Sequence, residues 1–261
     1  MNELQALLLG LIQGLTEFLP VSSSGHLELA SHLLGVTNAE NLTFTVTVHA
    51  ATVLSTLIVF RRDILQIIVG VMQFKWNDEL RYMLLLLLSA IPVAIVGLFF
   101  RDEAELLFTG NLKLVGGSLL ITASLLAFAH FFKREHGRQI TWKHSLIIGL
   151  AQAIAIIPGI SRSGATISTG ILLGNKRSDM ARFSFLMVLI PILGATSLDI
   201  IKGDFNNDAV VGTGALIAGF TSAFISGLLA CRLMIKLVSR GNLIYFALYC
   251  LIIAVIAIFA G

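Results

Sequence analysis

The stretch Gln13–His26, Q-G-L-T-E-F-L-P-V-S-S-S-G-H, interrupts an apolar segment with a carboxylate, three serines and a histidine. Pro20 has no backbone N–H and should end the helix before it, and the serines that follow are typical of the start of another helix. A second stretch, Gln152–Ala165, reads Q-A-I-A-I-I-P-G-I-S-R-S-G-A. In both, an S-x-S-G tetrapeptide begins nine residues after the glutamine, with a proline between them. The chain therefore contains two copies of one broken-helix element, the first acidic and the second basic.

The composition is that of an integral membrane protein. Apolar residues make up 56% of the chain, charged residues only 13%, and the mean hydropathy is +0.90. No polar stretch is long enough for a soluble domain, so we expect a single integral membrane domain over residues 1–261. Cys231 and Cys250 both lie in apolar segments, which suggests neither a disulfide framework nor a metal site. The N-terminus lacks a basic n-region, so we expect no cleavable signal peptide.

The apolar segments predict an all-α polytopic fold. Residues 4–19 and 26–34 are each too short to cross a hydrocarbon core of about 30 Å, so we expect them to form a re-entrant helical hairpin, and residues 145–157 and 165–173 repeat this pattern. Transmembrane helices are predicted at residues 42–60, 81–100, 112–132, 182–201, 209–231 and 243–260. Repeat 1 (about 1–132) and repeat 2 (about 143–261) then each contain one hairpin and three spans. Because three is odd, the second repeat must enter from the opposite face, which predicts an inverted-topology repeat.

The basic residues are distributed unequally between the two predicted sides. Of the 18 Lys and Arg residues, 14 fall in loops on one side, three on the other, and Arg162 lies in the second broken element. The positive-inside rule assigns the basic side to the cytoplasm, so both termini and the mouth of the first hairpin are predicted to lie outside it. His130, His136 and His144 lie in or beside a basic loop, and we expect them to be solvated.

The two breaks should build one polar site. Backbone that leaves helical geometry at membrane depth is tolerated only inside the protein or along a polar cavity, and symmetric breaks meet near the midplane. Free N–H groups at the start of each following helix, together with serine hydroxyls, can bind an anion, and the guanidinium of Arg162 suits phosphate oxygens. Placing Arg or Glu at the bilayer centre costs about 2.5–3.5 kcal/mol, so each needs a reason to be there. For Arg162, binding of a phosphate group is that reason.

Glu17 would repel a phosphate and therefore needs a different explanation. It can pair with Arg162, hold a divalent cation, or accept a proton from a serine nucleophile. Gln13 lies one helical turn earlier on the same face. His26 can act as an acid or base or donate to a phosphate oxygen. His49, in T-V-H-A-A-T, either faces the site or only hydrogen-bonds a neighbour, and a purely structural Glu17–Arg162 ion pair also remains open.

Both motifs resemble those of the undecaprenyl-pyrophosphate phosphatase family, also called bacitracin-resistance proteins. In that family the first motif is [E/Q]-x-x-x-E followed by P-V-S-S-[ST]-G-H, and the second is P-G-x-S-R-S-G-A-T, which here ends at Thr166. The family's carboxylate, nucleophile candidate, histidine and essential arginine correspond to Glu17, Ser23, His26 and Arg162. Members with Glu at the first motif position have two carboxylates where this chain has Gln13 and Glu17, which weakens any mechanism that needs both.

The resemblance implies hydrolysis of undecaprenyl diphosphate to the monophosphate carrier lipid of peptidoglycan synthesis, with bacitracin resistance as a consequence. It also implies a divalent cation, Mg or Ca, with Glu17 as its candidate ligand. We predict Glu17, Ser23, His26 and Arg162 as catalytic residues, with His49 beside the site. The predicted phosphate-binding residues are Gln13, Ser22, Ser24, Ser161, Ser163, Gly164 and Thr166.

Three function classes follow from these features. The first is a prenyl diphosphate hydrolase, in which Ser23 attacks phosphorus or a water oriented by Glu17 does so. The second is a transporter or flippase of a lipid-linked phosphate, which an inverted repeat by itself suggests, and the third is a structural subunit. We expect a bacterial cytoplasmic membrane location, a site open to the outer face, a lipid diphosphate and membrane lipid as partners, and no nucleic acid. The sequence leaves the oligomeric state open, a homodimer included.

Overall fold

The computed structural model describes residues 1–36, 38–100, 103, 106–107, 111–132, 137–194 and 211–260, apart from the side chains of residues 38–42. Within these residues the regular structure is helical, with one isolated bridge between Arg138 and Asn175, and the predicted all-α fold is confirmed. The helices are α1 (Glu3–Phe18), α2 (Ser23–Leu34), α3 (Asn38–Val59), α4 (Arg61–Val71), α5 (Asp78–Phe99), α7 (Leu112–Phe131), α8 (Trp142–Ile154), α9 (Arg162–Leu172), α10 (Arg177–Met187), α12 (Thr213–Arg240) and α13 (Leu243–Ala260).

Several helices are suited to cross a bilayer. Among the described residues, α5, α7, α12 and α13 are each long and apolar enough to do so. Helix α3, from Thr43, and α4 meet the same criteria as a pair, although they are bent by 70° relative to each other. Length and composition therefore support a multi-pass membrane protein.

The predicted boundaries differ from the observed ones at three places. The loop expected after residue 60 begins instead with α4, because its apolar residues recur at helical spacing. The span expected to end at residue 231 continues to Arg240, where Gly241 in the left-handed conformation (φ 78°) ends the helix. The span predicted at 182–201 is divided, since α10 ends at Met187 and a further helical stretch covers residues 189–194; residues 195–201 lie outside the described part.

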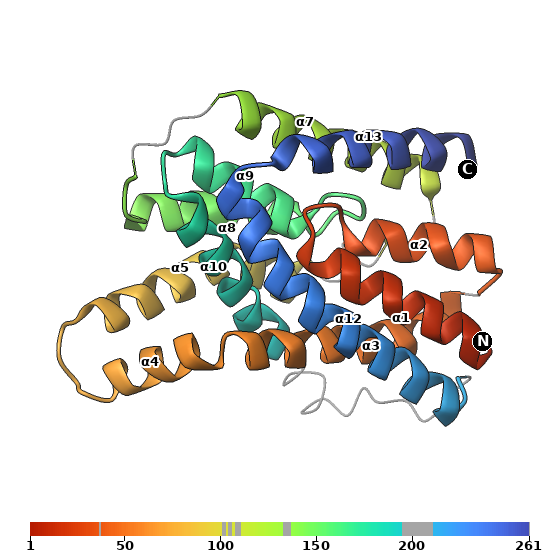
Figure 1. Cartoon of the computed structure of the whole chain (residues 1–261), viewed down its shortest axis with the longest axis horizontal. Helices are drawn as coiled ribbons and strands as arrows, with labels where there is room; N and C mark the ends of the chain where they lie inside the picture. Colours follow the sequence, from red (N-terminus) through yellow and green to blue (C-terminus); the bar gives the residue numbers. More distant parts are fainter. Residues whose placement is uncertain are drawn as a thin grey trace.

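The two broken elements enter the molecule from opposite ends. In Figure 1 the α1–α2 pair extends inward from the right-hand end and the α8–α9 pair from the left-hand end, and their turns approach each other in the middle. The start of α1 and the end of α13 lie at the same end, and α7 and α13 pack side by side. Helix α1 packs mainly on α12, and α8 packs mainly on α5.

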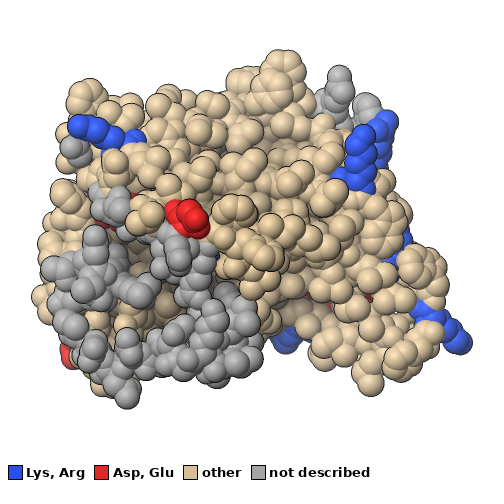
Figure 2. Space-filling model, turned by 180° about the vertical axis from the view of Figure 1, so that it is seen from behind, with Lys and Arg blue, Asp and Glu red and all other residues tan. Residues whose placement is uncertain are grey.

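Basic side chains also favour one end of the molecule. On the face drawn in Figure 2, Lys and Arg lie mainly toward the right-hand end, which is the left-hand end of Figure 1 because of the half-turn between the views. This is the end where α4 and α5 meet, and it is the one that the loop charges predict to be cytoplasmic. The membrane orientation itself stays a prediction.

The residues at each break explain why one helix ends and the next begins there. Leu19, which precedes Pro20, adopts the extended conformation (φ −70°, ψ 144°) that a following proline requires. Helix α2 then begins at Ser23, three residues before the predicted start, because the Ser22 hydroxyl accepts the N–H of Gly25 at 3.3 Å. Helix α9 likewise begins at Arg162 instead of residue 165, capped by Ser161 in the same way.

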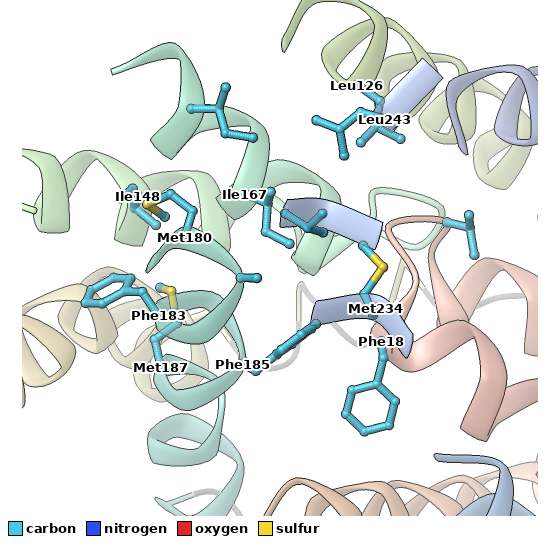
Figure 3. Packing of buried hydrophobic residues seen from close by; sticks show 14 of the residues in the cluster. Phe18, Leu126, Ile148, Ile167, Met180, Phe183, Phe185, Met187, Met234 and Leu243 are labelled. Atoms are coloured by element: carbon cyan, nitrogen blue, oxygen red, sulfur yellow. The ribbon is translucent and has the colours of Figure 1, made fainter. Parts of the chain in front are cut away.

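Buried apolar side chains fix the end of α1 beside its break. Phe18 contacts Phe185 of α10 edge to face, with ring centroids 5.7 Å apart, and Met234 of α12 lies in the same cluster (Figure 3). Further along α1, a Cβ atom added to Gly10 would collide with the backbone of Gly219 on α12. The two backbones therefore approach closely, as small residues permit in membrane helices. This packing sets the position of Glu17, the residue before Phe18.

Candidate active site

The two breaks contact each other at the centre of the fold. The Ser163 hydroxyl, at the start of α9, donates to the carbonyl of Leu19 in the first break at 3.1 Å. Thr122 of α7 donates to the Gly159 carbonyl and accepts the Ser161 N–H, both at 3.0 Å. Backbone polar groups that the breaks release are thus satisfied inside the protein, as the membrane interior requires.

Glu17 is the centre of a polar cluster that joins both breaks. Its Oε1 accepts a hydrogen bond from Nη2 of Arg162 at 2.9 Å. Its Oε2 accepts one from the Ser23 hydroxyl at 2.5 Å and another from Nε2 of Gln13 at 2.9 Å. The Glu17 side chain is only 11% exposed, whereas that of Arg162 is 31% exposed. The guanidinium can therefore reach an incoming ligand while it remains beside the carboxylate.

His49 approaches the same carboxylate from α3. Its Nε2 lies 3.8 Å from Oε2 of Glu17, and its Nδ1 bonds the Thr45 carbonyl at 2.8 Å. Because a carbonyl only accepts, Nδ1 carries the proton and Nε2 faces Glu17. Both alternatives for His49 therefore hold together: it faces the site and it also hydrogen-bonds a neighbour.

His26 lies apart from this cluster. Its Nδ1 donates to the Ser22 carbonyl at 2.7 Å, and its Nε2 is 2.9 Å from the Tyr249 hydroxyl of α13. The two rings also stack, with centroids 5.5 Å apart. Ser22 itself has a positive φ of 70°, uncommon for a residue with a side chain, and the His26 bond holds this turn. A proton-transfer role for His26 stays a prediction, and it would require exchange of the Tyr249 bond.

The remaining predicted phosphate-binding groups are held in hydrogen bonds within the protein. Ser24 lies 3.3 Å from the Ser22 hydroxyl, while Ser161 accepts the N–H of Gly164 at 3.0 Å. Thr166 donates to the Arg162 carbonyl at 2.8 Å and also contacts the Ser184 hydroxyl at 2.6 Å. Binding of phosphate by these groups therefore stays a prediction and would require some of these bonds to be exchanged.

The Glu17 cluster contains the groups needed for phosphoryl transfer. A hydroxyl bonded to a carboxylate is the arrangement of a nucleophile and its general base, and a neighbouring guanidinium can stabilise charge on a transferred phosphoryl group. Among the described residues, no three His, Cys, Asp or Glu side chains are grouped to hold a metal ion. The oxygen ligands nearest to such a role are the Glu17 carboxylate and the Gln13 carbonyl Oε1, which is buried and has no hydrogen-bond partner among the described residues.

Sequence reasoning missed the residues that support the motifs from other helices. Tyr249, Thr122 and Ser184 contact His26, Ser161 and Thr166 respectively. Each is a hydroxyl-bearing residue within an apolar segment, which is a weak signal, since many such residues only bond their own helix. Their partners become apparent only when α7, α10 and α13 are packed against the breaks.

The sequence matches one protein family over nearly its whole length. Residues 6–256 match the family described as bacitracin resistance protein BacA. The chain is 52% identical to the undecaprenyl-diphosphatase of Bacteroides fragilis, covering 99% of this chain and 98% of that protein. It is 51% identical to that of Bacteroides thetaiotaomicron, covering 97% and 96%, and 37% identical to undecaprenyl-diphosphatase 1 of Bacillus cereus, covering 98% and 96%. The chain therefore belongs to the bacitracin resistance protein BacA family.

Proposed function

We propose that this protein hydrolyses undecaprenyl diphosphate to undecaprenyl phosphate and inorganic phosphate. The observation that carries the proposal is the contact of one buried carboxylate, Glu17, with both the Ser23 hydroxyl and the Arg162 guanidinium. The relatives named undecaprenyl-diphosphatase match 97–99% of the chain, which supports the same reaction. Recycling of the carrier lipid for peptidoglycan synthesis, and resistance to bacitracin, follow from this activity. The alternative of a transporter or flippase is not favoured.

The proposed reaction proceeds through a phosphoserine. Arg162 binds the terminal phosphate and stabilises the charge that develops in line. The Ser23 oxygen attacks the terminal phosphorus, and Glu17 takes the hydroxyl proton. The bond to the bridging oxygen breaks, and undecaprenyl phosphate leaves. Glu17 gives the proton to the departing product and is again a carboxylate. Water then attacks the phosphoserine, and Glu17 takes a proton from that water and returns it to the serine oxygen. Inorganic phosphate is released and the serine is restored.

Direct attack by water is the rival mechanism. In that case Glu17 orients and deprotonates a water molecule, and Ser23 only donates a hydrogen bond to the carboxylate. The 2.5 Å hydrogen bond from Ser23 to Glu17 supports the covalent route, because the hydroxyl already donates to the carboxylate that would take its proton.

A divalent cation would bind at this site together with substrate. Magnesium is commonly bound by one or two carboxylates plus substrate phosphate oxygens, so Glu17 with Gln13 and the diphosphate would supply its ligands. The cation would neutralise part of the diphosphate charge.

The proposed topology is an inverted repeat in the bacterial cytoplasmic membrane. The entry of the α1–α2 and α8–α9 pairs from opposite ends supports it. The packing supports it as well, because the first helix of each pair packs mainly on a long helix of the other repeat: α1 on α12, and α8 on α5. In this arrangement the two pairs are re-entrant hairpins, and the site opens to the outer face because the mouth of the first hairpin lies there.

Phosphate release tests the function. Protein purified in detergent should release inorganic phosphate from undecaprenyl or farnesyl diphosphate, and a chelator should lower the rate if a cation takes part. Arg162→Ala, prepared in parallel and compared by thermal unfolding, is the control for contaminating phosphatases. If the two proteins released phosphate at equal rates, the proposed function would be wrong.

Cysteine labelling tests the topology. In a background without Cys231 and Cys250, an impermeant maleimide added to intact cells should label a cysteine at position 38 or 206. A cysteine at Gly137 or Lys176 should react only after permeabilisation. Labelling of positions 38 and 176 from the same side would refute the inverted repeat, because both follow equivalent hairpins.

A further inference from the structure

A cavity lies at the end of α9 farthest from Arg162. It has a volume of about 260 Å³, and its lining includes Arg138, Lys143, His144, Ile147, Leu172 and Gly174. Arg162 is the first residue of α9 and Leu172 the last, so ten helical steps of about 1.5 Å separate them by roughly 15 Å. The cavity is therefore distinct from the Glu17 cluster.

Buried groups orient the histidine of this cavity. Asn175, which is completely buried, donates through Nδ2 to the Gly170 carbonyl at 3.0 Å. Its Oδ1 therefore faces Nδ1 of His144, 2.9 Å away, and that ring nitrogen must carry a proton. Nε2 is left as the ring atom available to a ligand. His144 is thus not the solvated loop residue expected from the sequence.

The backbone of Arg138 is held in place as well. Its N–H donates to the Gly174 carbonyl at 3.2 Å, and it forms the isolated bridge with Asn175. Gly174 has φ 89°, a conformation that favours glycine, and this turn brings the carbonyl to Arg138. The segment before α8 and the end of α9 are thereby joined, which gives the cavity a defined shape.

The cavity is suited to an anion. Among the described residues, its lining contains an arginine, a lysine and a histidine but no Asp or Glu. Within the described part of the chain, neither Arg138 nor Lys143 forms an ion pair. The guanidinium and ammonium groups of two residues that line one cavity match the several oxygens of a phosphate group.

Its surroundings indicate that this phosphate belongs to a lipid. Helix α8 carries exposed apolar side chains that begin beside the cavity, with Trp142, Leu146 and Leu150 four residues apart. Tryptophan is typical of the membrane interface, and the apolar side chains beyond it provide a surface for acyl chains. The cavity also lies on the side that the loop charges predict to be cytoplasmic, where the leaflet carries anionic lipids.

We propose that this cavity binds the phosphate of an anionic phospholipid headgroup, whose acyl chains lie along the exposed apolar side of α8. Arg138 and Lys143 donate to the phosphate oxygens, and Nε2 of His144 accepts a hydrogen bond from a hydroxyl of the headgroup. Ile147 and Leu172 form the apolar wall. This site does not depend on the catalytic function proposed above, because it uses none of the same residues.

Lipid binding by the purified protein tests this proposal. The full chain in detergent is titrated with short-chain phosphatidylglycerol and, separately, with phosphatidylcholine, and bound lipid is measured by native mass spectrometry. We expect phosphatidylglycerol to bind at least about tenfold more tightly. Arg138→Gln/Lys143→Gln should remove most of that preference. Arg232→Gln/Lys236→Gln is the matched control, since it removes the same charge from exposed residues outside the cavity and should retain the preference.

Two further arms distinguish the alternatives. His144→Ala keeps the number of Lys and Arg residues, so it leaves membrane orientation unaffected and should still weaken phosphatidylglycerol binding several-fold. Inorganic phosphate and glycerol phosphate are titrated as free-phosphate probes and should compete only weakly. The proposal is overturned if these probes bind as tightly as the lipid, which would indicate a free-phosphate site. It is also overturned if the control pair loses as much binding as the cavity pair, which would indicate only general charge attraction.

Discussion

Replacement of Ser23 by alanine separates the two mechanisms because they predict losses of different size. If water is the nucleophile, Ser23→Ala removes only the hydrogen bond to Glu17. A hydrogen bond to a charged group contributes about 1.5–3 kcal/mol, which corresponds to a rate loss of about tenfold to about 150-fold. If Ser23 is the nucleophile, its removal should lower kcat on the order of a thousandfold or more. We expect the larger loss.

The Glu17 variant and the double variant extend this test. Glu17→Gln removes the proton acceptor and should cost about a hundredfold to ten-thousandfold. If the two residues act as one unit, Ser23→Ala/Glu17→Gln should be no slower than the slower single variant. Ser124→Ala is the matched control, because the exposed Ser124 hydroxyl donates to the Leu120 carbonyl of its own helix, outside the Glu17 cluster. It should keep activity within about tenfold of the unmodified protein.

Chemical trapping provides an independent measurement. The enzyme is mixed with diphosphate labelled on its terminal phosphate, quenched in acid and digested, and the labelled peptide is identified. We expect the label on Ser23 in the unmodified protein and no label in Ser23→Ala. If Ser23→Ala retained more than about a hundredth of the activity, the nucleophile assignment would be refuted, and water activated by Glu17 would be the better mechanism.

Three other substitutions test the groups around this pair. Arg162→Lys keeps the charge but not the planar pair of donors, so kcat/KM should fall by about tenfold to about 150-fold, and near-normal turnover would point to a structural role instead. Gln13→Glu places a second carboxylate one helical turn from the first, so its activity should depend more strongly on a divalent cation in a magnesium titration, and an unchanged titration would count against cation binding there. Tyr249→Phe removes the hydroxyl that donates to His26 and should lower kcat by about twofold to tenfold with little change in KM, whereas the exposed Tyr245→Phe should have no effect.

The sequence determined the class of fold and the position of both breaks. Pro20 and the capping serines act on the backbone within a few residues. They therefore end one helix and start the next without depending on the tertiary fold. The hydropathy of a segment also depends only on its own residues, so it predicts membrane-spanning helices from the sequence. Four of the predicted spans correspond to α5, α7, α12 and α13. Helix ends were less predictable, because α12 continues past charged residues until Gly241 ends it.

The pairing inside the site was only partly accessible from the sequence. Gln13 and Glu17 share a helical face, so their contact follows from a spacing of four residues. The Glu17–Arg162 pair joins residues 145 positions apart, and two charges of opposite sign within apolar segments favour such a pairing. The sequence left three roles open for Glu17, and the folded chain places Ser23 and Arg162 on its two oxygens at once.

Only the tertiary structure decided the contacts that no motif contains. His26 bonds Tyr249, which is 223 residues away, and Asn175 orients His144 from the turn between α9 and α10. A hydroxyl or an amide in an apolar segment has many local partners, and its distant partner depends on which helices pack together. By itself the sequence determined a membrane protein with two broken helices and the residues of a phosphate site. The packing of α13 against the first break, and of the α9 end against the start of α8, determined how those residues are held, because side-chain contacts between helices arise only when the chain is folded.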